Sequence, residues 1–252
     1  TTWSRGLGDV YKRQEQAKAL GVKVELITNG TILNEKTARR LIDSGLDMLW
    51  VSLDGASEET YADVRLGAEL PRILRNLRRF VKMRPANHYP KPELGIAFVA
   101  MKRNIADLPK VIRLGKSLKA RHFAVSNLQP ATAGMQAELL YDQTMNNIAF
   151  LQGSHLPSLS LPKMDFDETT RDALFEAFNS QLNVQFVGNN WGGASDTCNY
   201  IENGTMSIAW TGDVSPCWPL MHTHTSYLHG KPRLSGKHVI GNVEDRSLEE
   251  LW

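Results

Sequence analysis

Two short stretches, Val24–Gly30 (VELITNG) and Met48–Gly55 (MLWVSLDG), decide the fold of this chain. Each is an apolar strand that ends in a small polar triplet, and the segment between them has helical spacing. The unit is therefore predicted as strand, loop, helix and strand, with both triplets at the carboxyl ends of neighbouring parallel strands. In a β/α barrel that rim is where ligands bind. We expect a ligand site at this rim.

The alternation of helices and strands continues as far as Pro130. Capping residues and prolines mark the starts of helices, and apolar runs mark strands. Helices are predicted to begin at Asn34, Ser57, Pro71 and Asp107, and further strands are predicted over 93–100 and 122–130. Four strands separated by helices predict successive right-handed crossovers in one parallel sheet.

The pattern changes after Pro130. Residues 131–164 are predicted as a loop and a helix that cross the open face of the barrel. Residues 167–180 are predicted as an amphipathic helix with Leu174, Phe175 and Phe178 inward. From residue 182 the chain turns to short strands, among them a hairpin whose turn is Thr211–Asp213, so a domain boundary is expected near residue 181.

Two stretches of sequence, in this order along the chain, suggest a family. ITNGTIL (27–33), followed by WVSLDGASEETYADVR (50–65), resembles the barrel of the radical S-adenosylmethionine enzymes. CNYIENGTMSIAWTGDVSPC (198–217) resembles the opening of their auxiliary-cluster extension, called SPASM. The resemblance implies an α/β fold: a partial (β/α) TIM-like barrel over 15–181 that lacks its first strands, then a small truncated SPASM-like domain over 182–252.

The family's defining motif, C-x-x-x-C-x-x-C, is absent, because the chain has only two cysteines and both lie far downstream. The chain is therefore expected to be an inactive fragment of a radical enzyme. Asp9–Gln14 is the literal translation of a transposon end sequence, so residues 1–14 are expected to be non-native; the alternative is a basic amino-terminal arm. Ser247 and Glu250 form a capping box that opens a helix just before Trp252, which suggests truncation there too.

Composition agrees with the body of a soluble enzyme. The chain has 252 residues, 42% hydrophobic content and a net charge of +2, which is enough apolar mass for a sizeable core. No apolar run approaches a membrane span, and the charge balance calls for neither nucleic acid nor membrane as a partner. Two cysteines in a chain of this length argue for a reducing compartment, so a cytoplasmic location is expected.

The strand ends combine hydroxyl, amide, carboxylate and bare backbone, a set that suits an aminoacyl nucleoside. The resemblance implies that Thr28, Asn29, Gly30, Ser52 and Asp54 line the S-adenosylmethionine pocket. It also implies that Arg65 meets the cofactor's carboxylate through its planar guanidinium fork, and that Asn127 contacts the cofactor from the far side. The alternative is that these residues are only turn formers and helix caps.

Cys198 and Cys217 are the candidate metal ligands. Iron–sulfur clusters need thiolates, and a hairpin between the two cysteines would bring them to one edge, so the resemblance implies that they bind an auxiliary 4Fe-4S cluster. One alternative is that they are inert thiols. Another is a zinc site with His222, His224 and His229, although the long, irregular spacing of these residues is a poor match to a zinc finger.

Two functions remain open. In the first, the intact protein cleaves S-adenosylmethionine reductively and starts radical chemistry on a peptide, a protein or a small cofactor precursor, with electrons from a donor such as flavodoxin or ferredoxin. In the second, the chain is a non-redox α/β barrel with a zinc-binding or structural appendix. The iron content of the complete protein after anaerobic reconstitution distinguishes the two functions. No motif in the sequence identifies the substrate.

Overall fold

The computed structural model describes residues 7–67, 69–141, 164–186, 189–190, 200, 203–228 and 230–252. The chain divides into two compact units. The first contains the residues up to Asn127 together with 165–191, and the second contains 128–164 and the residues from Gly192 onward. The boundary near residue 181 stays a prediction about domain organisation.

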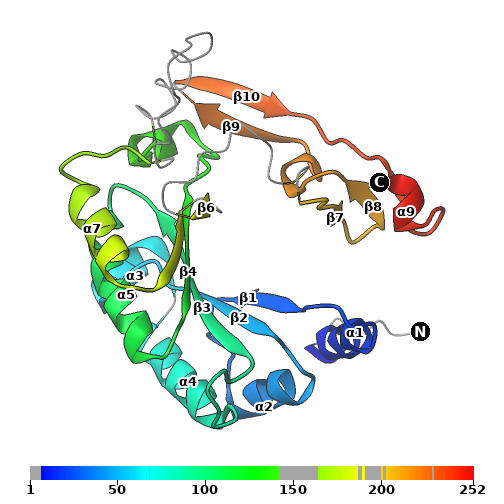
Figure 1. Ribbon diagram of the computed structural model, residues 1–252. Helices are drawn as coiled ribbons and strands as arrows, with labels where there is room; N and C mark the ends of the chain where they lie inside the picture. Colours follow the sequence, from blue (N-terminus) through cyan, green and yellow to red (C-terminus); the bar gives the residue numbers. More distant parts are fainter. Residues whose placement is uncertain are drawn as a thin grey trace, which may run out of the picture. The chain divides into compact units, whose positions relative to one another are not determined.

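The first unit is built on one sheet whose strands follow chain order (Figure 1). Its five parallel strands pair in consecutive βαβ units, and β6 adds to β5 in the antiparallel direction. The strands are β1 (Glu25–Thr28), β2 (Met48–Ser52), β3 (Glu93–Ala100), β4 (His122–Asn127), β5 (Asn183–Phe186) and β6 (Asn189–Asn190). Within the described residues β1 pairs only with β2, so it is an edge strand. The predicted α/β class is confirmed, and the open sheet is that of a partial barrel.

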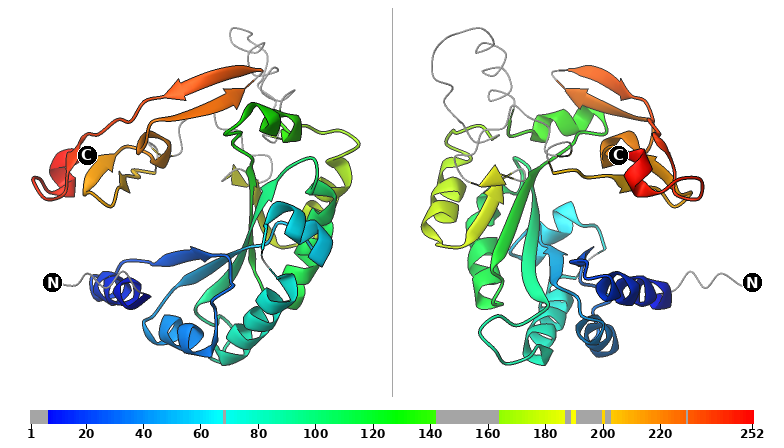
Figure 2. Two further views of the ribbon diagram at one scale, coloured as in Figure 1. Left: turned by 180° about the vertical axis from the view of Figure 1, so that it is seen from behind. Right: turned by 45° about the vertical axis from the view of Figure 1, so that its right-hand side comes forward.

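Helices cover one face of this sheet, and both further views show α2, α4, α5 and α7 on that side (Figure 2). The helices of the first unit are α1 (Leu7–Ala19), α2 (Glu35–Asp43), α3 (Glu58–Val64), α4 (Leu70–Met83), α5 (Leu108–Ser117) and α7 (Arg171–Asn179), with a 3₁₀ turn η1 at Ile105–Asp107. The core lies between, where Ile96, Phe98 and Phe123 of the sheet and Leu77 and Phe80 of α4 are at most 2% exposed. Each such side chain contributes about 1.5–3 kcal/mol by leaving water.

The other face of the sheet is partly exposed, as the inner face of an incomplete barrel would be. Ile27, Trp50, Gly95 and His122 lie in one register row across it. The ring of Trp50 covers Gly95, where an added Cβ would lie 2.4 Å from Trp50 Cε3. Ile27 is 65% exposed on β1, which is an edge strand within the part of the chain that the structure describes.

Helix starts follow the predicted local chemistry. Asn34 Oδ1 accepts a hydrogen bond from Thr37 N at 2.9 Å and caps α2. Ser57 forms a capping box with Thr60 at the start of α3, and Pro71 lies in the first turn of α4. Helix α1 begins at Leu7 and therefore includes part of the segment predicted as non-native.

The inward residues of α7 differ from the prediction. Leu174 is buried, but Phe175 and Phe178 are 53% and 64% exposed. Ala173 and Ala177 are buried instead, and α7 packs against α5. Phe175 contacts Phe166 edge-on, with ring centroids 6.2 Å apart. The helix packs through Ala173, Leu174 and Ala177, which leaves both phenyl groups largely outside the packed face.

The second unit is made of short antiparallel strands. They form a three-stranded sheet of β7 (Ser207–Ile208), β8 (Asp213–Ser215) and β11 (Gly241–Asn242), and a ribbon of β9 (His224–Leu228) and β10 (Lys231–Ser235). The unit also contains the 3₁₀ turns η2 (Ala133–Glu138) and η3 (Trp218–Leu220), and the helix α9 (Leu248–Leu251). The predicted hairpin is present, with Gly212 at φ +84° and its amide donating to Ala209 O at 3.0 Å.

Residues 128–141 belong to this second unit. Tyr227 N donates to Pro130 O at 2.9 Å, and Gly230 N donates to the side chain of Gln136. The helix predicted within 131–164 falls largely on residues 142–163, which lie outside the described residues. Among the helices described, none combines the length and apolar character that a membrane span requires.

Candidate functional site

The predicted strand-end residues lie at one edge of the sheet. Thr28 is the last residue of β1 and Ser52 is the last residue of β2. Asn127 ends β4. Because β1 to β4 are parallel, their carboxyl ends point the same way, and the structure therefore places these residues at the ligand-binding edge typical of α/β proteins.

The loop after β1 is held by its own side chains. Thr28 Oγ1 accepts a hydrogen bond from Gly30 N at 3.2 Å, and Asn29 Oδ1 accepts one from Thr31 N at 3.0 Å. Gly30 has φ +75°, a conformation that favours glycine. Asn76 of α4 donates to Gly30 O at 3.0 Å and Thr31 O at 3.2 Å. The loop is therefore held by its own side chains and by Asn76 of α4, and Asn29 is exposed at its tip.

Asp54 and Arg65 form an ion pair at the end of β2. Asp54 is 1% exposed, and its Oδ2 accepts a hydrogen bond from Arg65 Nε at 2.6 Å. Its Oδ1 accepts from Val99 N, at the end of β3, at 2.7 Å. Charge-assisted bonds on both oxygens compensate for the burial of the carboxylate. Asp54 is therefore enclosed by the protein, whereas the Arg65 side chain is 30% exposed and reaches the rim.

The start of α3 lies directly against the end of β2. Tyr61 is fully buried and donates to Ser52 O at 3.4 Å. Burial raises the pKa of Tyr61; Arg65 opposes this effect and Asp54 adds to it. A Cβ at Gly55 would lie 2.6 Å from Tyr61 N, so glycine is required here because two backbones approach closely. The close approach places Arg65, at the end of α3, beside Asp54.

Two polar residues after β3 complete the arrangement, and the sequence analysis did not assign them a site role. Asn104 is 2% exposed and donates to Val99 O at 2.9 Å and Asp54 O at 3.1 Å. Asp107 accepts from Ala56 N at 3.1 Å. Burial acts to raise the pKa of Asp107, but hydrogen bonds from Thr60, Ala56 N and Lys110 outweigh it and leave the pKa below its ordinary value. The sequence signal that could have indicated both residues is their position soon after a strongly apolar strand.

Asn127 is half-buried and pairs in register with Ala100. By strand alternation it shares a face with buried Val125, while exposed Ser126 lies on the other face. The structure brings Asn127 to the right edge of the sheet. Its contact with a cofactor stays a prediction, as do the contacts of the other strand-end residues.

Of the two candidate metal ligands, Cys217 is half-exposed and caps η3, just after β8 of the predicted hairpin. Cys198 and His229 lie outside the described residues. His224 contacts Gln129 and the His222 carbonyl oxygen through its two ring nitrogens. In the described part of the chain no three His, Cys, Asp or Glu side chains gather as a metal site. The cluster and zinc assignments both stay predictions.

Comparison with known proteins extends these observations. A family model of the SPASM iron–sulfur cluster-binding domain matches residues 198–252. The chain is 24% identical over 242 residues to the tungsten-containing aldehyde ferredoxin oxidoreductase cofactor-modifying protein of Pyrococcus furiosus; the match covers 94% of this chain and 61% of that protein. It is 28% identical over 130 residues to the AdoMet-dependent heme synthase of Methanosarcina barkeri, a match covering 52% of this chain and 36% of that one.

Solved structures share the fold. Streptococcus suis SuiB bound to S-adenosylmethionine superposes with a TM-score of 0.59 at 14% identity, covering 97% of this chain and 51% of SuiB. Native anSMEcpe with bound AdoMet gives a TM-score of 0.58 at 18% identity, covering 98% of this chain and 62% of that chain. The SPASM match, the sequence relatives and the shared fold together support the expected family, the radical S-adenosylmethionine enzymes that carry a SPASM domain.

Proposed function

We propose that this chain is the S-adenosylmethionine-binding and auxiliary-cluster portion of an enzyme that cleaves S-adenosylmethionine reductively to start radical chemistry. The observation that carries the proposal is the Asp54–Arg65 pair at the carboxyl edge of the sheet. Asp54 is the positioning residue, because it is enclosed and holds Arg65 through Nε alone. Among the described residues, neither Nη atom of Arg65 has a hydrogen-bond partner, so both are available at the rim.

The two Nη groups form a planar donor pair that matches a carboxylate. Asp54 already neutralises the charge of Arg65, so the pair recognises the cofactor's carboxylate by donor geometry more than by net charge. Ser52, Thr28 and the backbone of the loop after β1 would form hydrogen bonds with the ribose hydroxyls and the amine. In the proposed enzyme, S-adenosylmethionine would supply the radical that starts the chemistry.

The cluster that generates this radical does not fit the residues of this chain. It needs three thiolates from one loop, whereas the chain holds only Cys198 and Cys217. We therefore propose that the 252-residue chain alone does not cleave the cofactor, and that the three thiolates come from outside these residues. Cys198 and Cys217 fall within the region matched by the SPASM model, and we assign them to an auxiliary 4Fe-4S cluster.

The relatives' names suggest the class of substrate. One solved SuiB structure is bound to a precursor peptide, SuiA, and the Pyrococcus relative is named as a cofactor-modifying protein. We propose a peptide, a protein or a small cofactor precursor as the substrate, an electron donor such as flavodoxin or ferredoxin, and a cytoplasmic location. The chain spans 61% of the length of that relative, so these proposals concern the whole protein.

Calorimetric titration tests the Arg65 assignment with two ligands that differ in one group. S-adenosylmethionine carries the amino-acid moiety, and 5′-methylthioadenosine lacks it. Arg65→Lys keeps the charge beside Asp54 and removes the planar fork, so it should weaken S-adenosylmethionine binding about tenfold and leave methylthioadenosine binding unchanged. Arg72→Gln, an exposed arginine on α4, is the matched control and should alter neither.

Three results would contradict the assignment. Failure of the unmodified chain to bind either nucleoside would remove the site itself. Equal weakening of both nucleosides by Arg65→Lys would mean that Arg65 maintains the fold and does not bind the carboxylate. An equal effect of Arg72→Gln would mean that the loss of S-adenosylmethionine binding is not specific to Arg65.

A further inference from the structure

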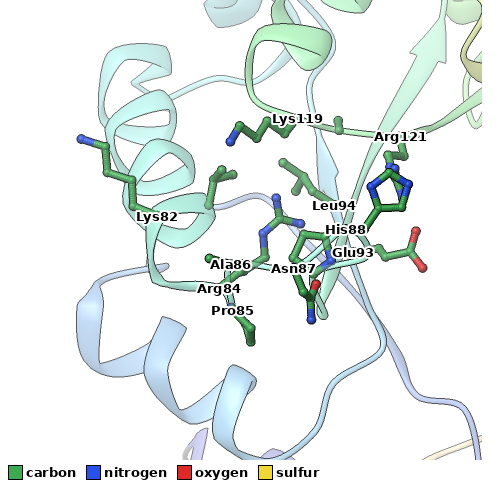
Figure 3. Close-up of a pocket in the computed structure, with 13 residues that line it drawn as sticks. Lys82, Arg84, Pro85, Ala86, Asn87, His88, Glu93, Leu94, Lys119 and Arg121 are labelled. Atoms are coloured by element: carbon green, nitrogen blue, oxygen red, sulfur yellow. The ribbon is translucent and has the colours of Figure 1, made fainter.

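A pocket of about 470 Å³ opens at the amino-terminal edge of the sheet, the edge opposite the Asp54–Arg65 pair (Figure 3). It lies between the end of α4, the connection 85–90, the start of β3 and the turn before β4. Strands β3 and β4 enter the sheet at this edge. The pocket is therefore separate from the proposed cofactor site.

The lining of the pocket is strongly cationic. Lys82, Arg84, Lys119 and Arg121 all line it, and among the lining residues Glu93 is the one acid. The Glu93 carboxylate is already engaged by His122 Nε2 at 2.9 Å. Within the described residues none of the four cations forms an ion pair, so the pocket holds an excess of positive charge without a counter-ion.

Arg84 gives the clearest indication of a missing partner. The residue is 7% exposed, and its Nη1 donates to Pro92 O at 2.9 Å. Its guanidinium lies 5.7 Å from the centre of the Phe80 ring, and its Nε is buried without any hydrogen-bond partner. Burial lowers the pKa of Arg84; nearby Arg121 adds to this effect and Glu93 opposes it. A buried cation with an unmet donor is unfavourable unless an anion compensates for it.

The other cations are held in place around the same space. Arg121 stacks over the Tyr89 ring, with Cζ 4.6 Å from its centroid. Lys119 follows α5 in the left-handed region, at φ +57°, where its amide donates to Lys116 O at 3.0 Å. Figure 3 draws Lys119 and Arg84 on either side of one space beside Leu94. The positive groups are thus carried by two segments, the end of α4 and the turn before β4, which meet at one cavity.

We propose that this pocket binds a small phosphate-bearing anion. Arg84, Lys119 and Arg121 against one acid leave a charge surplus that a phosphate group, with a charge of about −2 at neutral pH, matches better than a single carboxylate does. A guanidinium presents several N–H groups in a fixed plane, which suits phosphate oxygens. The cavity is larger than one phosphate, so a phosphate ester with an organic part would fit within it.

Inorganic pyrophosphate is the probe for the test. Calorimetric titration of the 252-residue chain at low salt should give saturable binding, with a dissociation constant of about 1 mM or less. The double variant Lys119→Gln/Arg121→Gln should bind at least about tenfold more weakly. Arg72→Gln removes the same kind of charge from the far end of α4 and should leave affinity unchanged. The double variant avoids Arg84, whose removal would disturb the packing around Phe80.

The outcomes separate specific from general binding. No saturation below about 10 mM, or an equal loss in Arg72→Gln, would overturn the proposal because binding would then be absent or due to overall charge. Citrate binding as tight as that of pyrophosphate would overturn the choice of phosphate. The double variant should also bind S-adenosylmethionine as the unmodified chain does, so failure of this proposal is distinguishable from failure of the cofactor site.

Discussion

Arg65 Nε lies 2.6 Å from Asp54 Oδ2, and this carboxylate is buried to 1% exposure beneath the rim of the sheet. Because Asp54 also accepts from Val99 N, one carboxylate joins the end of β2, the end of α3 and the end of β3. Asp54, which the sequence predicts to contact a ligand, thus positions Arg65, and the Arg65 side chain reaches the rim.

The first prediction concerns this buried carboxylate. Asp54→Asn should lower the free energy of unfolding by about 2 kcal/mol, because it removes charge-assisted hydrogen bonds from an enclosed site. Urea denaturation of the chain measures the change. Asp63→Asn is the control: Asp63 is 58% exposed and 3.4 Å from Arg103, so its loss should change stability by less than about 0.5 kcal/mol. Equal effects of the two variants would show that burial of Asp54 contributes nothing.

The second prediction concerns Gly95 under the Trp50 ring. Gly95→Ala should destabilise the chain by about 1–3 kcal/mol, because the new Cβ would lie 2.4 Å from Trp50 Cε3. Trp50→Leu in the same chain should recover part of this loss, a non-additivity that a double-mutant cycle measures by urea denaturation. Gly134→Ala has open space around the added Cβ and should have little effect. Strict additivity of the Trp50 and Gly95 changes would count against the contact.

The third prediction is a pH dependence set by Asp47. Burial acts to raise the pKa of Asp47, but hydrogen bonds from Lys18, Val24 N and Lys91 outweigh it and hold the pKa far below its ordinary value. Since the folded pKa lies below the unfolded value of about 3.9, the carboxylate stabilises the fold above that value. The contribution is lost as the pH falls from there toward the folded pKa.

The difference in unfolding free energy between the unmodified chain and Asp47→Asn should therefore be largest near about pH 7 and shrink progressively as the pH falls below about 4. Lys18→Gln should weaken the pH dependence more than Lys91→Gln, because Lys18 is the closer partner, at 2.6 Å against 3.0 Å, and the less exposed one. A constant difference between unmodified chain and Asp47→Asn across this range would refute the assignment.

The fourth prediction concerns the auxiliary cluster of the complete protein. Replacing both Cys198 and Cys217 with alanine should lower the iron and sulfide content after anaerobic reconstitution, because the cluster loses thiolate ligands. Cofactor cleavage at the upstream cluster should persist at least in part. His222→Ala/His224→Ala is the control and should leave the iron content unchanged. Unchanged iron in the cysteine variant would remove the auxiliary-cluster assignment, and zinc loss in the histidine variant would favour the zinc alternative.

Local features were predictable because their chemistry lies within a few residues. Asn34 and Ser57 cap helices through bonds to amides three residues on, and Gly212 supplies the positive φ of its hairpin turn. Strand β3 coincides with the apolar run 93–100 that predicted it. The alternation of such segments was sufficient to indicate a parallel α/β sheet, and from this the edge at which the predicted site residues lie.

Tertiary structure decided the partners of the polar residues. Asp54 and Asn104 are separated by 50 residues, and Ala56 and Asp107 by 51, so no local pattern reveals that they bond. Likewise, a helix with several apolar side chains has more than one possible inner face, and packing against α5 rather than periodicity left Phe175 exposed.

The sequence by itself therefore determined the class of fold, the order of its elements and the edge that carries the candidate site. These depend on hydrophobic periodicity and on short-range hydrogen bonds. Only the tertiary structure decided that Asp54 holds Arg65, and that cations from α4 and from the turn before β4 meet in one pocket. The physical reason is that burial and the pairing of charges depend on which distant segments meet, and this is settled when the helices pack on the sheet.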